Sequence, residues 1–178
     1  MKRTLREMLV GVIYPKGRGD AHLGRTGIDR AFITFEQSKK KVEYLKFLHK
    51  FAQAQGIVSE ESRTYIRSDQ RYNIINESLY FRTKSLEELK PLADIFLDRE
   101  GKKIIPSNIS ELLTIRSLAF WIMDDGQQVK NGGVTLCTDS YKSEEINILK
   151  KVLETKFNLI TSIHKKKVKR IRFTKESI

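Results

Sequence analysis

The first third of the chain alternates between helical and strand-like patterns. Apolar residues at helical spacing over residues 5–13 predict a helix, and the proline and glycines of residues 15–19 interrupt it, because proline lacks a backbone donor and glycine lacks stiffness. Residues 30–35 alternate as a strand does. A second helix, with Ser38 as its N-cap, then runs to Gly56.

The middle of the chain reads as a hairpin followed by a helix. Aromatic and β-branched residues alternate over residues 64–83, and the polar pair Asn76 and Glu77 marks the expected turn. Ser85 and Glu88 have the spacing of a capping box, which predicts that a helix begins there.

The last part of the chain repeats the order of the first. One long helix is expected from Asn108 or Ser110 to Gly126, followed by a strand at residues 133–138 and a helix with Ser143 as N-cap. A final strand pair, LITSIHKKKVKRIRF, is dense in Lys and Arg. The two parts therefore follow one plan.

Matched positions support an internal repeat. Leu9 matches Leu118 at an offset of 109 residues, whereas Asp20 matches Asp125 at an offset of 105. The difference, 109 − 105, indicates that the first copy carries four extra residues between its apolar helix and its aspartate.

Charge narrows the class of partner. The 178 residues hold 34 Lys and Arg against 22 Asp and Glu, a net charge of +12, and the sequence pI is near 9.8. Such a balance suits a polyanion, DNA, RNA or an anionic membrane surface. No apolar run approaches the roughly 20 residues that a membrane-spanning helix needs, and no amphipathic basic stretch favours a membrane surface. Nucleic acid is the expected partner, and a structural role unrelated to nucleic acid fits poorly with this charge.

Cysteine and histidine usage excludes two kinds of site. The single cysteine, Cys137, allows no intramolecular disulfide and indicates a reducing compartment, and three scattered histidines offer no zinc-ligand spacing. The N-terminal apolar run is short for a signal peptide, and Glu7 follows too early for an acid-poor transit peptide. We expect a protein that works in an organelle to be made there.

The string LAFWIMDDG, residues 118–126, resembles the nine-residue motif that names the LAGLIDADG family. A first copy, LVGVI, is followed after an interruption by GDAHLGR. The strings AFITFEQSKKKVEYL, IIPSN and GVTLCTDSYKSEE, in this order, are similar to the two-motif organellar branch of homing endonucleases and intron maturases. The resemblance covers nearly the whole chain.

The resemblance implies an α+β fold, a pseudo-two-fold pair of αββαββ-type repeats whose motif helices pack together and whose saddle-shaped sheets lie over the DNA major groove. It places one repeat at residues 1–100 and the other at residues 101–178, and the second repeat ends before the helix that the family usually adds. Small residues are expected at the helix contact, and Gly11 and Ala119 fit that position.

The same resemblance assigns catalytic and metal-binding roles. Asp20 and Asp125 match the acidic residue that ends each motif and would each bind Mg²⁺, a hard cation that prefers oxygen ligands. Gln37 matches a polar position near the scissile phosphates, with Asp139 as its partner in the second repeat. Asp20 is equally compatible with a loop position in a turn-forming RGD string. Gln37 and Asp139 are each compatible with an exposed helix-start position, and for Asp139 this interpretation is favoured because the residue precedes a helix.

Basic residues on the expected strands and at one helix start are candidates for nucleic-acid contacts. Six of eight residues from 165 to 172 are Lys or Arg, and their mutual repulsion favours an anionic partner over solvent alone. The candidate contacts to phosphates or base edges are Lys39, Arg67, Arg71, Arg82, Lys84, Lys165, Lys167, Arg170 and Arg172.

Two functions follow from the resemblance. The first is a homing endonuclease that binds a long duplex DNA site and hydrolyses phosphodiester bonds with divalent metal. The second is a cleavage-deficient relative, an RNA-binding maturase or ribonucleoprotein component, and the interrupted first motif favours it. Either function places the protein in a mitochondrion or chloroplast, with duplex DNA or structured RNA as its partner, without a membrane, and with other ribonucleoprotein components in the second case.

Overall fold

The structure is a computed structural model. It describes residues 1–14, 21–58, 63–69, 74–130, 132–165 and 169–174, with the backbone alone for residues 63–69, 74–76, 165 and 169. The chain forms two compact units, one made of Met1–Gly17 and Ile95–Ile178 and the other of Arg18–Asp94. The sequence-based repeat boundary near residue 100 and this division differ, because the first helix packs in the unit that holds the second repeat.

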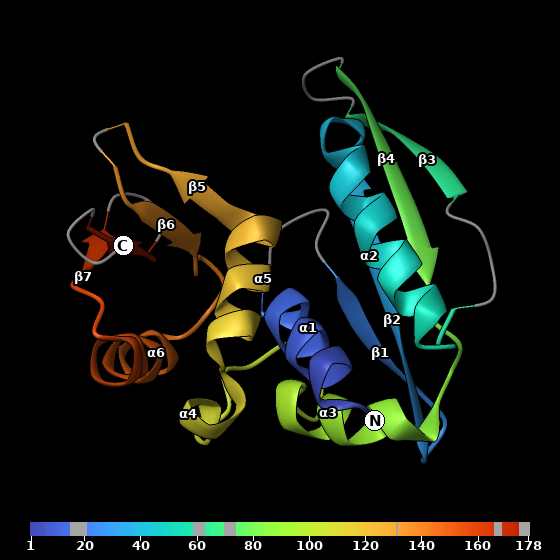
Figure 1. Ribbon diagram of the computed structural model, residues 1–178, viewed down its shortest axis with the longest axis horizontal. Coiled ribbons are helices and arrows are strands. Elements are labelled where there is room, and N and C mark those ends of the chain that lie inside the picture. The colour runs from blue at the N-terminus through green and yellow to red at the C-terminus, as the bar shows by residue number, and fades with distance from the viewer. Residues whose placement is uncertain (15–20, 59–62, 70–73, 131, 166–168, 175–178) are drawn as a thin grey trace. The chain divides into compact units, whose positions relative to one another are not determined.

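The unit of Arg18–Asp94 is an antiparallel sheet with the strand order β1-β2-β4-β3 and a helix on one face (Figure 1). The side chains of β2 alternate between buried and more exposed positions, and Phe35 stacks on Phe81 across to β4 at a centroid distance of 4.5 Å. His49 of the covering helix meets the Phe81 ring edge-on. The elements are β1 (His22–Thr26), β2 (Arg30–Ser38), η1 (Lys39–Lys41), α2 (Val42–Ala54), β3 (Arg63–Asp69), β4 (Ile74–Arg82), η2 (Glu87–Leu89) and α3 (Lys90–Phe96). The boundary between the two units along the chain falls within α3, after Asp94.

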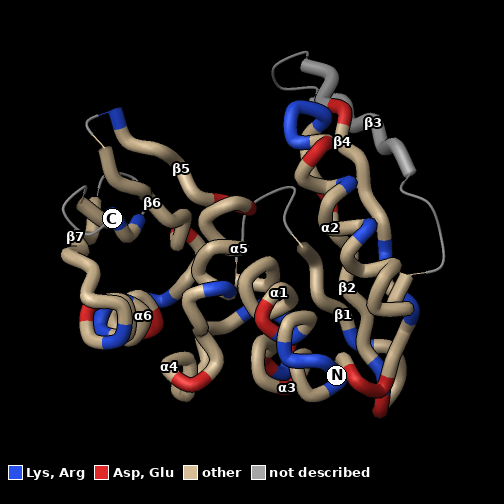
Figure 2. The backbone as a smooth tube through the Cα atoms, viewed as in Figure 1, with Lys and Arg blue, Asp and Glu red and all other residues tan. Residues whose placement is uncertain are grey.

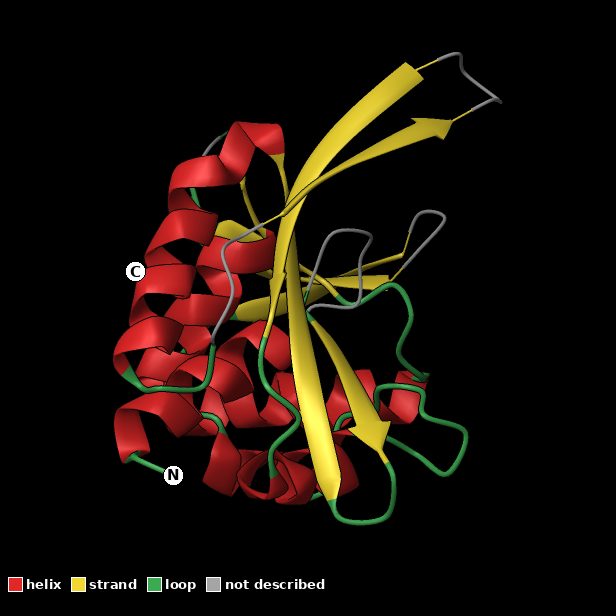
Figure 3. Ribbon diagram, turned by 90° about the vertical axis from the view of Figure 1, so that its right-hand side faces the viewer, coloured by secondary structure: helices red, strands yellow, loops and turns green. Residues whose placement is uncertain are grey.

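The other unit combines a helix pair with a second four-stranded antiparallel sheet, in the order β5-β6-β8-β7. The side chains of Leu136 and Ile171, paired across β6 and β8, are both fully buried on one face of that sheet. Figure 3 shows that helices lie on one face of the strands within each unit. The elements are α1 (Arg3–Ile13), α4 (Ile109–Leu112), α5 (Ile115–Asp125), β5 (Gly126–Gln128), β6 (Val134–Cys137), α6 (Ser143–Phe157), β7 (Thr161–Lys165) and β8 (Lys169–Phe173).

The expected fold class is confirmed: the protein is α+β, and each repeat has the element order α, β, β, α, β, β. In the first repeat this order is α1, β1, β2, α2, β3, β4, and in the second it is α5, β5, β6, α6, β7, β8. The sequence pattern missed β1, because His22, Gly24 and Arg25 give this strand little apolar alternation.

Helices α1 and α5 approach each other closely at Gly11. A Cβ atom placed on Gly11 would lie 2.3 Å from the carbonyl oxygen of Ser117 and 2.6 Å from the Cβ atom of Phe120. Ser117 is fully buried there, whereas Ala119 is exposed. The small residue that α5 offers to the contact is therefore Ser117, and the assignment of Ala119 to the contact was wrong.

The aromatic group at the end of α1 ties several parts of this unit together. Tyr14, fully buried, stacks on Trp121 of α5 at a centroid distance of 4.7 Å and meets Phe96 edge-on at 5.1 Å. The hydroxyl of Tyr141 donates a hydrogen bond of 2.6 Å to the backbone carbonyl of Tyr14. The chain is thus held in place just before residues 15–20.

We expect the substitution Tyr141→Phe to destabilise the protein by about 1–2 kcal/mol, because it leaves the buried carbonyl of Tyr14 without its donor. For a chain of this size the melting temperature should fall by roughly 2–8 °C. The control is Tyr80→Phe, on the polar face of the other sheet, which should change it by about 1 °C or less. Equal melting curves for Tyr141→Phe and the wild type would mean that this hydrogen bond contributes nothing.

Two features predicted from the sequence, the hairpin turn and the undivided helix, were wrong. The hairpin pairs Asp69 with Ile74, so its connection precedes Asn76 and Glu77, which belong to β4. The expected long helix is divided at Leu113, whose backbone is extended. Thr114 then caps α5 by accepting a hydrogen bond from the backbone N–H of Ser117.

The predicted caps at Ser85 and Ser143 were also wrong, whereas Ser38 occupies the N-cap position of η1 without a capping hydrogen bond from its side chain. Ser85 caps no helix, since its hydroxyl hydrogen-bonds to that of Thr26 and the helical turn begins only at Glu87. Ser38 ends β2 and makes no capping hydrogen bond with its side chain. Ser143 is already the first residue of α6, whose start is held by Glu145 accepting from the backbone N–H of residue 142. Local propensity placed these helices correctly and their first residues incorrectly.

Candidate nucleic-acid interface and catalytic site

Helix α5 ends in the acidic pair of the motif. Asp124 is 3% exposed, and Asp125, the last residue of the helix, is half-buried with its Oδ2 atom buried. A carboxylate at a helix C-terminus is disfavoured by the helix dipole. Its position there is better explained by a binding role than by a contribution to stability.

The thiol of Cys137, on β6, donates a hydrogen bond to the carboxylate of Asp125. Burial, and then the negative charge of Asp125, raises the pKa of this thiol to about 12. The thiol therefore stays protonated at neutral pH and keeps donating to the carboxylate. In the sequence, the single Cys137 indicates only a reducing compartment. Its place two residues before Asp139 gives no sign of a contact with Asp125.

The raised pKa of Cys137 predicts slow alkylation, since thiolate is the nucleophile. At pH 9 the metal-free folded protein should react with iodoacetamide at least about 100-fold more slowly than the same protein in denaturant, where an ordinary thiol pKa near 8.5 applies. Because the chain has one cysteine, total label measures this site directly. Equal rates in the folded and denatured states would contradict the buried, hydrogen-bonded thiol.

Arg170, on β8, is held by two neighbours on the same sheet. Its Nε and Nη2 atoms donate to the two carboxylate oxygens of Asp139 at 3.0 and 2.9 Å, and Nη1 donates to Oε1 of Gln127 at 3.1 Å. The hydrogen bonds that Arg170 donates to Asp139 are the largest cause of the raised pKa of Arg170. A two-pronged pair of this kind fixes the plane of the guanidinium group.

Cys137 and Arg170 are direct partners in the β6–β8 ladder, so Asp125, Cys137, Arg170, Asp139 and Gln127 form one cluster at the end of α5. The same face of this sheet carries the polar residues Thr135, Ser162, His164 and Arg172. Asp139 is thus engaged by a strand arginine, and α6 begins only at residue 143. The helix-start interpretation of Asp139 was wrong.

The unit of Arg18–Asp94 places Gln37 on the buried side of its sheet. Gln37 is 5% exposed and lies on the same face of β2 as Phe35, whereas Thr34 and Glu36 lie on the opposite face. Its role near a phosphate remains a prediction. Lys39 pairs with Glu77 at 2.5 Å, and the Nζ atom of Lys84 is 3.5 Å from the carbonyl oxygen of Gly56.

Several residues assigned from the sequence lie outside what the structure describes. Asp20, Arg71 and Lys167 are not among the described residues, and for Arg67 and Lys165 only the backbone, on β3 and β7, is described. Arg82 and Arg172 lie on the polar faces of their sheets. Along α6, lysines are interspersed with glutamates (Figure 2), so the sequence of this helix is not uniformly basic.

The oxygen donors near Asp125 determine whether a divalent cation fits there. Within the described ranges no three His, Cys, Asp or Glu residues converge as metal ligands. Asp124 and Asp125 each have a buried carboxylate oxygen, and Asp125 is the one that matches the motif's acidic ligand, while Asp139 is engaged by Arg170. One protein carboxylate completed by phosphate oxygens and water suits Mg²⁺, which commonly keeps much of its hydration shell.

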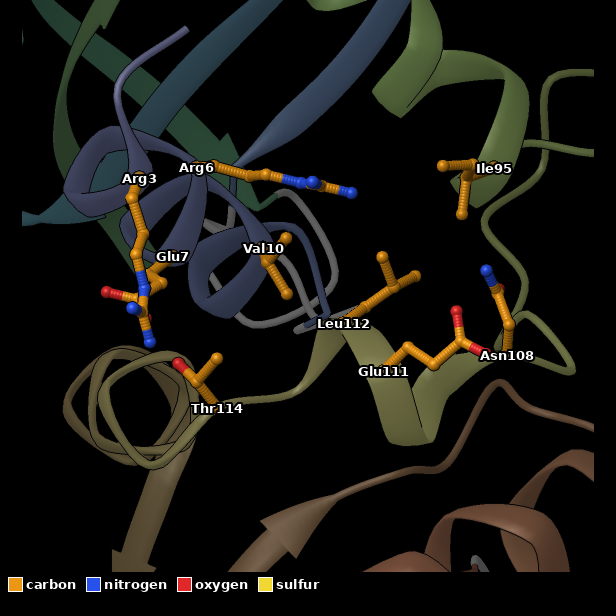
Figure 4. Close-up of a pocket in the computed structure, with 9 residues that line it drawn as sticks. All are labelled: Arg3, Arg6, Glu7, Val10, Ile95, Asn108, Glu111, Leu112 and Thr114. Atoms are coloured by element: carbon orange, nitrogen blue, oxygen red, sulfur yellow. The ribbon is translucent and has the colours of Figure 1, made fainter.

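A cavity of about 430 Å³ lies in the same unit, at the end of the helix pair remote from Asp125 (Figure 4). Its wall includes Glu7, which bridges Arg3 at 3.3 Å and Arg116 at 2.9 Å, and Thr114 at the start of α5. The lining carries two arginines, Arg3 and Arg6, and two glutamates, Glu7 and Glu111, whose charges offset one another. Neither Asp125 nor Gln37 lines this cavity.

Two antiparallel sheets with polar faces and a motif helix ending in Asp125 define the class of protein. The chain matches the LAGLIDADG DNA endonuclease family over residues 6–178, and it belongs to that family. No helix in the described part of the chain is long and apolar enough to cross a membrane.

Named relatives include both maturases and endonucleases. The chain is 25% identical over 165 residues to the cytochrome b mRNA maturase bI2 of Debaryomyces hansenii, covering 93% of this chain and 61% of that protein. It is 32% identical over 105 residues to the intron-encoded endonuclease ai4 of Dictyostelium discoideum, covering 57% of this chain and 65% of that protein. The chain thus spans less than two thirds of these relatives.

A solved structure with a similar fold is the homing endonuclease I-WcaI bound to its DNA recognition sequence. It has a TM-score of 0.82 at 26% identity, and the match covers 98% of this chain and 76% of that one. I-DmoI in complex with DNA and Mn matches with a TM-score of 0.53 at 10% identity, over 96% of this chain and 89% of that one, which shows the fold alone.

Proposed function

We propose that this protein is a homing endonuclease that binds a long duplex DNA site and hydrolyses phosphodiester bonds with a divalent cation, Mg²⁺ in the cell. The observation that carries the proposal is the cluster at the end of α5, where Asp125 lies beside a fixed arginine on the polar face of a sheet. The DNA-bound homing endonuclease of similar fold supports duplex DNA as the substrate.

Asp125 is the residue that would hold the cation in this half of the site, with Asp20 as its counterpart from the first motif. When bound, such a cation stabilises the charge that develops on the phosphate and promotes attack by water. The thiol of Cys137 donates to the Asp125 carboxylate and orients it.

Arg170 would face the negatively charged backbone of the DNA. Asp139 and Gln127 hold its guanidinium in one plane, so little side-chain freedom remains to be lost when a phosphate approaches. Asp139 offsets part of the charge of Arg170. Arg170 would therefore contribute more to orienting a phosphate than to the overall electrostatic attraction of the DNA. The other strand arginines and lysines supply most of the attraction to phosphates.

A maturase is the second candidate, and one observation favours it. The cytochrome b mRNA maturase bI2 of Debaryomyces hansenii matches 93% of this chain. Under this alternative the partner is structured RNA, with other ribonucleoprotein components, and no strand is cut. In either case we propose an organellar protein, mitochondrial or chloroplast, encoded within the organelle, as the intron-encoded relatives suggest.

We predict that affinity for duplex DNA falls steeply with salt, because each Lys or Arg that neutralises a phosphate releases counterions and adds about 0.9 to the slope of log K against log salt. With about six such contacts the affinity should drop by roughly 1,000-fold between 50 and 200 mM salt. Fluorescence anisotropy with a labelled duplex measures this slope. A flat response would remove the charge argument for a nucleic-acid partner.

The experiment that tests the proposed function uses supercoiled plasmids carrying a library of candidate intron-insertion sites, incubated with the protein with and without Mg²⁺. Linear plasmid that appears only with Mg²⁺ supports the endonuclease. Binding without any linear or nicked product in Mg²⁺ or Mn²⁺, together with preferential binding of a folded intron RNA, supports the maturase instead.

A further inference from the structure

A half-buried aromatic residue, Phe32, lies on the polar face of the sheet in the unit of Arg18–Asp94. Phe32 on β2 is paired with Gly24 on β1. A Cβ atom placed on Gly24 would lie 2.5 Å from Cζ of Phe32, with both Cε atoms within 3.1 Å. The ring therefore extends over the space that any other side chain at residue 24 would fill, and the glycine is what lets the ring lie down on the sheet.

The guanidinium group of Arg82 lies over this ring. Its Cζ atom is 3.4 Å from the centroid of Phe32. Arg82 ends β4 and pairs with Thr34, so Arg82 and Phe32 are diagonal neighbours across adjacent strands on one face. At this distance the arginine is held by its attraction to the ring, and most of its side-chain freedom is already lost.

Arg82 differs from Arg170 in what holds it. The Nε and Nη2 atoms of Arg170 donate hydrogen bonds to Asp139, and its Nη1 atom donates one to Gln127. Arg82 instead rests on a ring that accepts no conventional hydrogen bond, and it makes no ion pair with another described residue. Within the described part of the chain, no residue accepts a hydrogen bond from its N–H donors, which lie at the edge of the guanidinium plane.

We propose that Arg82, oriented by Phe32, reads a guanine in the major groove of the DNA site. This inference rests on the proposed function. A guanidinium that donates two parallel hydrogen bonds to O6 and N7 is the commonest specific arginine contact to a base, and it requires a fixed plane. β2 and β4 are the two central strands of the sheet, where a face laid in the groove meets base edges, while phosphates lie toward its margins.

The stacked ring of Phe32 also favours a base, and not a phosphate, as the DNA group that Arg82 contacts. A phosphate is a diffuse target that a mobile lysine or arginine satisfies, and it gains little from a guanidinium held flat. A base edge lies in one plane, so an arginine that is already oriented loses less freedom on binding it. Phe32 thereby determines specificity through Arg82 without touching the guanine.

The test begins with selection of duplexes from a randomised library by the wild-type protein without divalent metal. Each guanine of the preferred site is then replaced in turn by 7-deazaguanine, which lacks the N7 acceptor. We expect one replacement to weaken wild-type binding by about 5- to 150-fold, the range for loss of a paired arginine contact. Arg82→Lys, which keeps the charge but loses the planar pair of donors, should discriminate less between the modified and unmodified duplexes, and Phe32→Leu should also retain only part of the discrimination.

Matched controls are Arg99→Lys, at an exposed position in the other unit, and Phe47→Leu, at an exposed position on α2, and both should discriminate like the wild type. If no guanine position distinguishes Arg82→Lys from the wild type, the inference is wrong while duplex binding stands. If the wild type enriches no duplex at all, the proposed function itself fails and this inference fails with it.

Discussion

Asp125→Asn should abolish metal-dependent cleavage and leave duplex binding intact. The amide keeps the shape of the side chain but loses the charge that a hard dication needs, and loss of several kcal/mol of transition-state stabilisation corresponds to a rate at least about 100-fold lower. The rate of strand cleavage in Mg²⁺ and the affinity measured without metal separate these two effects. Asp20→Asn should behave in the same way if the first motif supplies the second carboxylate.

The matched control for this prediction is Asp94→Asn, which removes an exposed carboxylate paired with Lys90. Surface pairs of this kind contribute about 0–1 kcal/mol, so cleavage and stability should change little. Full cleavage by Asp125→Asn would show that this carboxylate holds no catalytic cation. Loss of binding together with cleavage would instead assign Asp125 a structural role at the end of α5.

Gly11→Leu should destabilise the protein more than any surface substitution of similar size. A Cβ atom at residue 11 already falls 2.3 Å from the backbone oxygen of Ser117, which cannot move without shifting α5. Overpacking of this kind costs about 1–3 kcal/mol or more, so the melting temperature should fall by roughly 5–10 °C.

Ala119→Leu provides the control, because Ala119 lies on the same helix as Ser117 and is exposed. Its melting temperature should stay within about 2 °C of the wild type, since exposed substitutions commonly cost less than about 0.5 kcal/mol. Equal effects of the two substitutions would mean that α1 and α5 do not meet at Gly11.

Periodicity predicted most helices and strands because burial on one face is a local property of the sequence. Boundaries were less predictable, since they depend on partners distant in the chain: Ser85 pairs with Thr26 instead of capping a helix. The same limit explains why Ala119 was wrongly assigned to the contact between α1 and α5. The repeat offset of 109 residues that relates Leu9 to Leu118 relates Gly11 to Phe120, and Phe120 does lie against Gly11.

The candidate site was predictable where a motif marked it and unpredictable where pairing across strands built it. The motif identified Asp125, and the density of Lys and Arg identified Arg170. The contacts of Arg170 with Gln127 and of Cys137 with Asp125 depend on the register of β5, β6 and β8. No spacing in the sequence encodes that register, so neither Gln127 nor Cys137 was assigned a role.

The central claim is that the cluster around Asp125 cuts DNA, and strand-resolved cleavage by the wild-type protein tests it most directly. A duplex carrying the site selected from the plasmid library is labelled separately on each strand and incubated in Mg²⁺. The proposed function predicts metal-dependent cleavage of both strands at fixed positions. Tight binding of this duplex with both strands intact in Mg²⁺ and Mn²⁺ would contradict it.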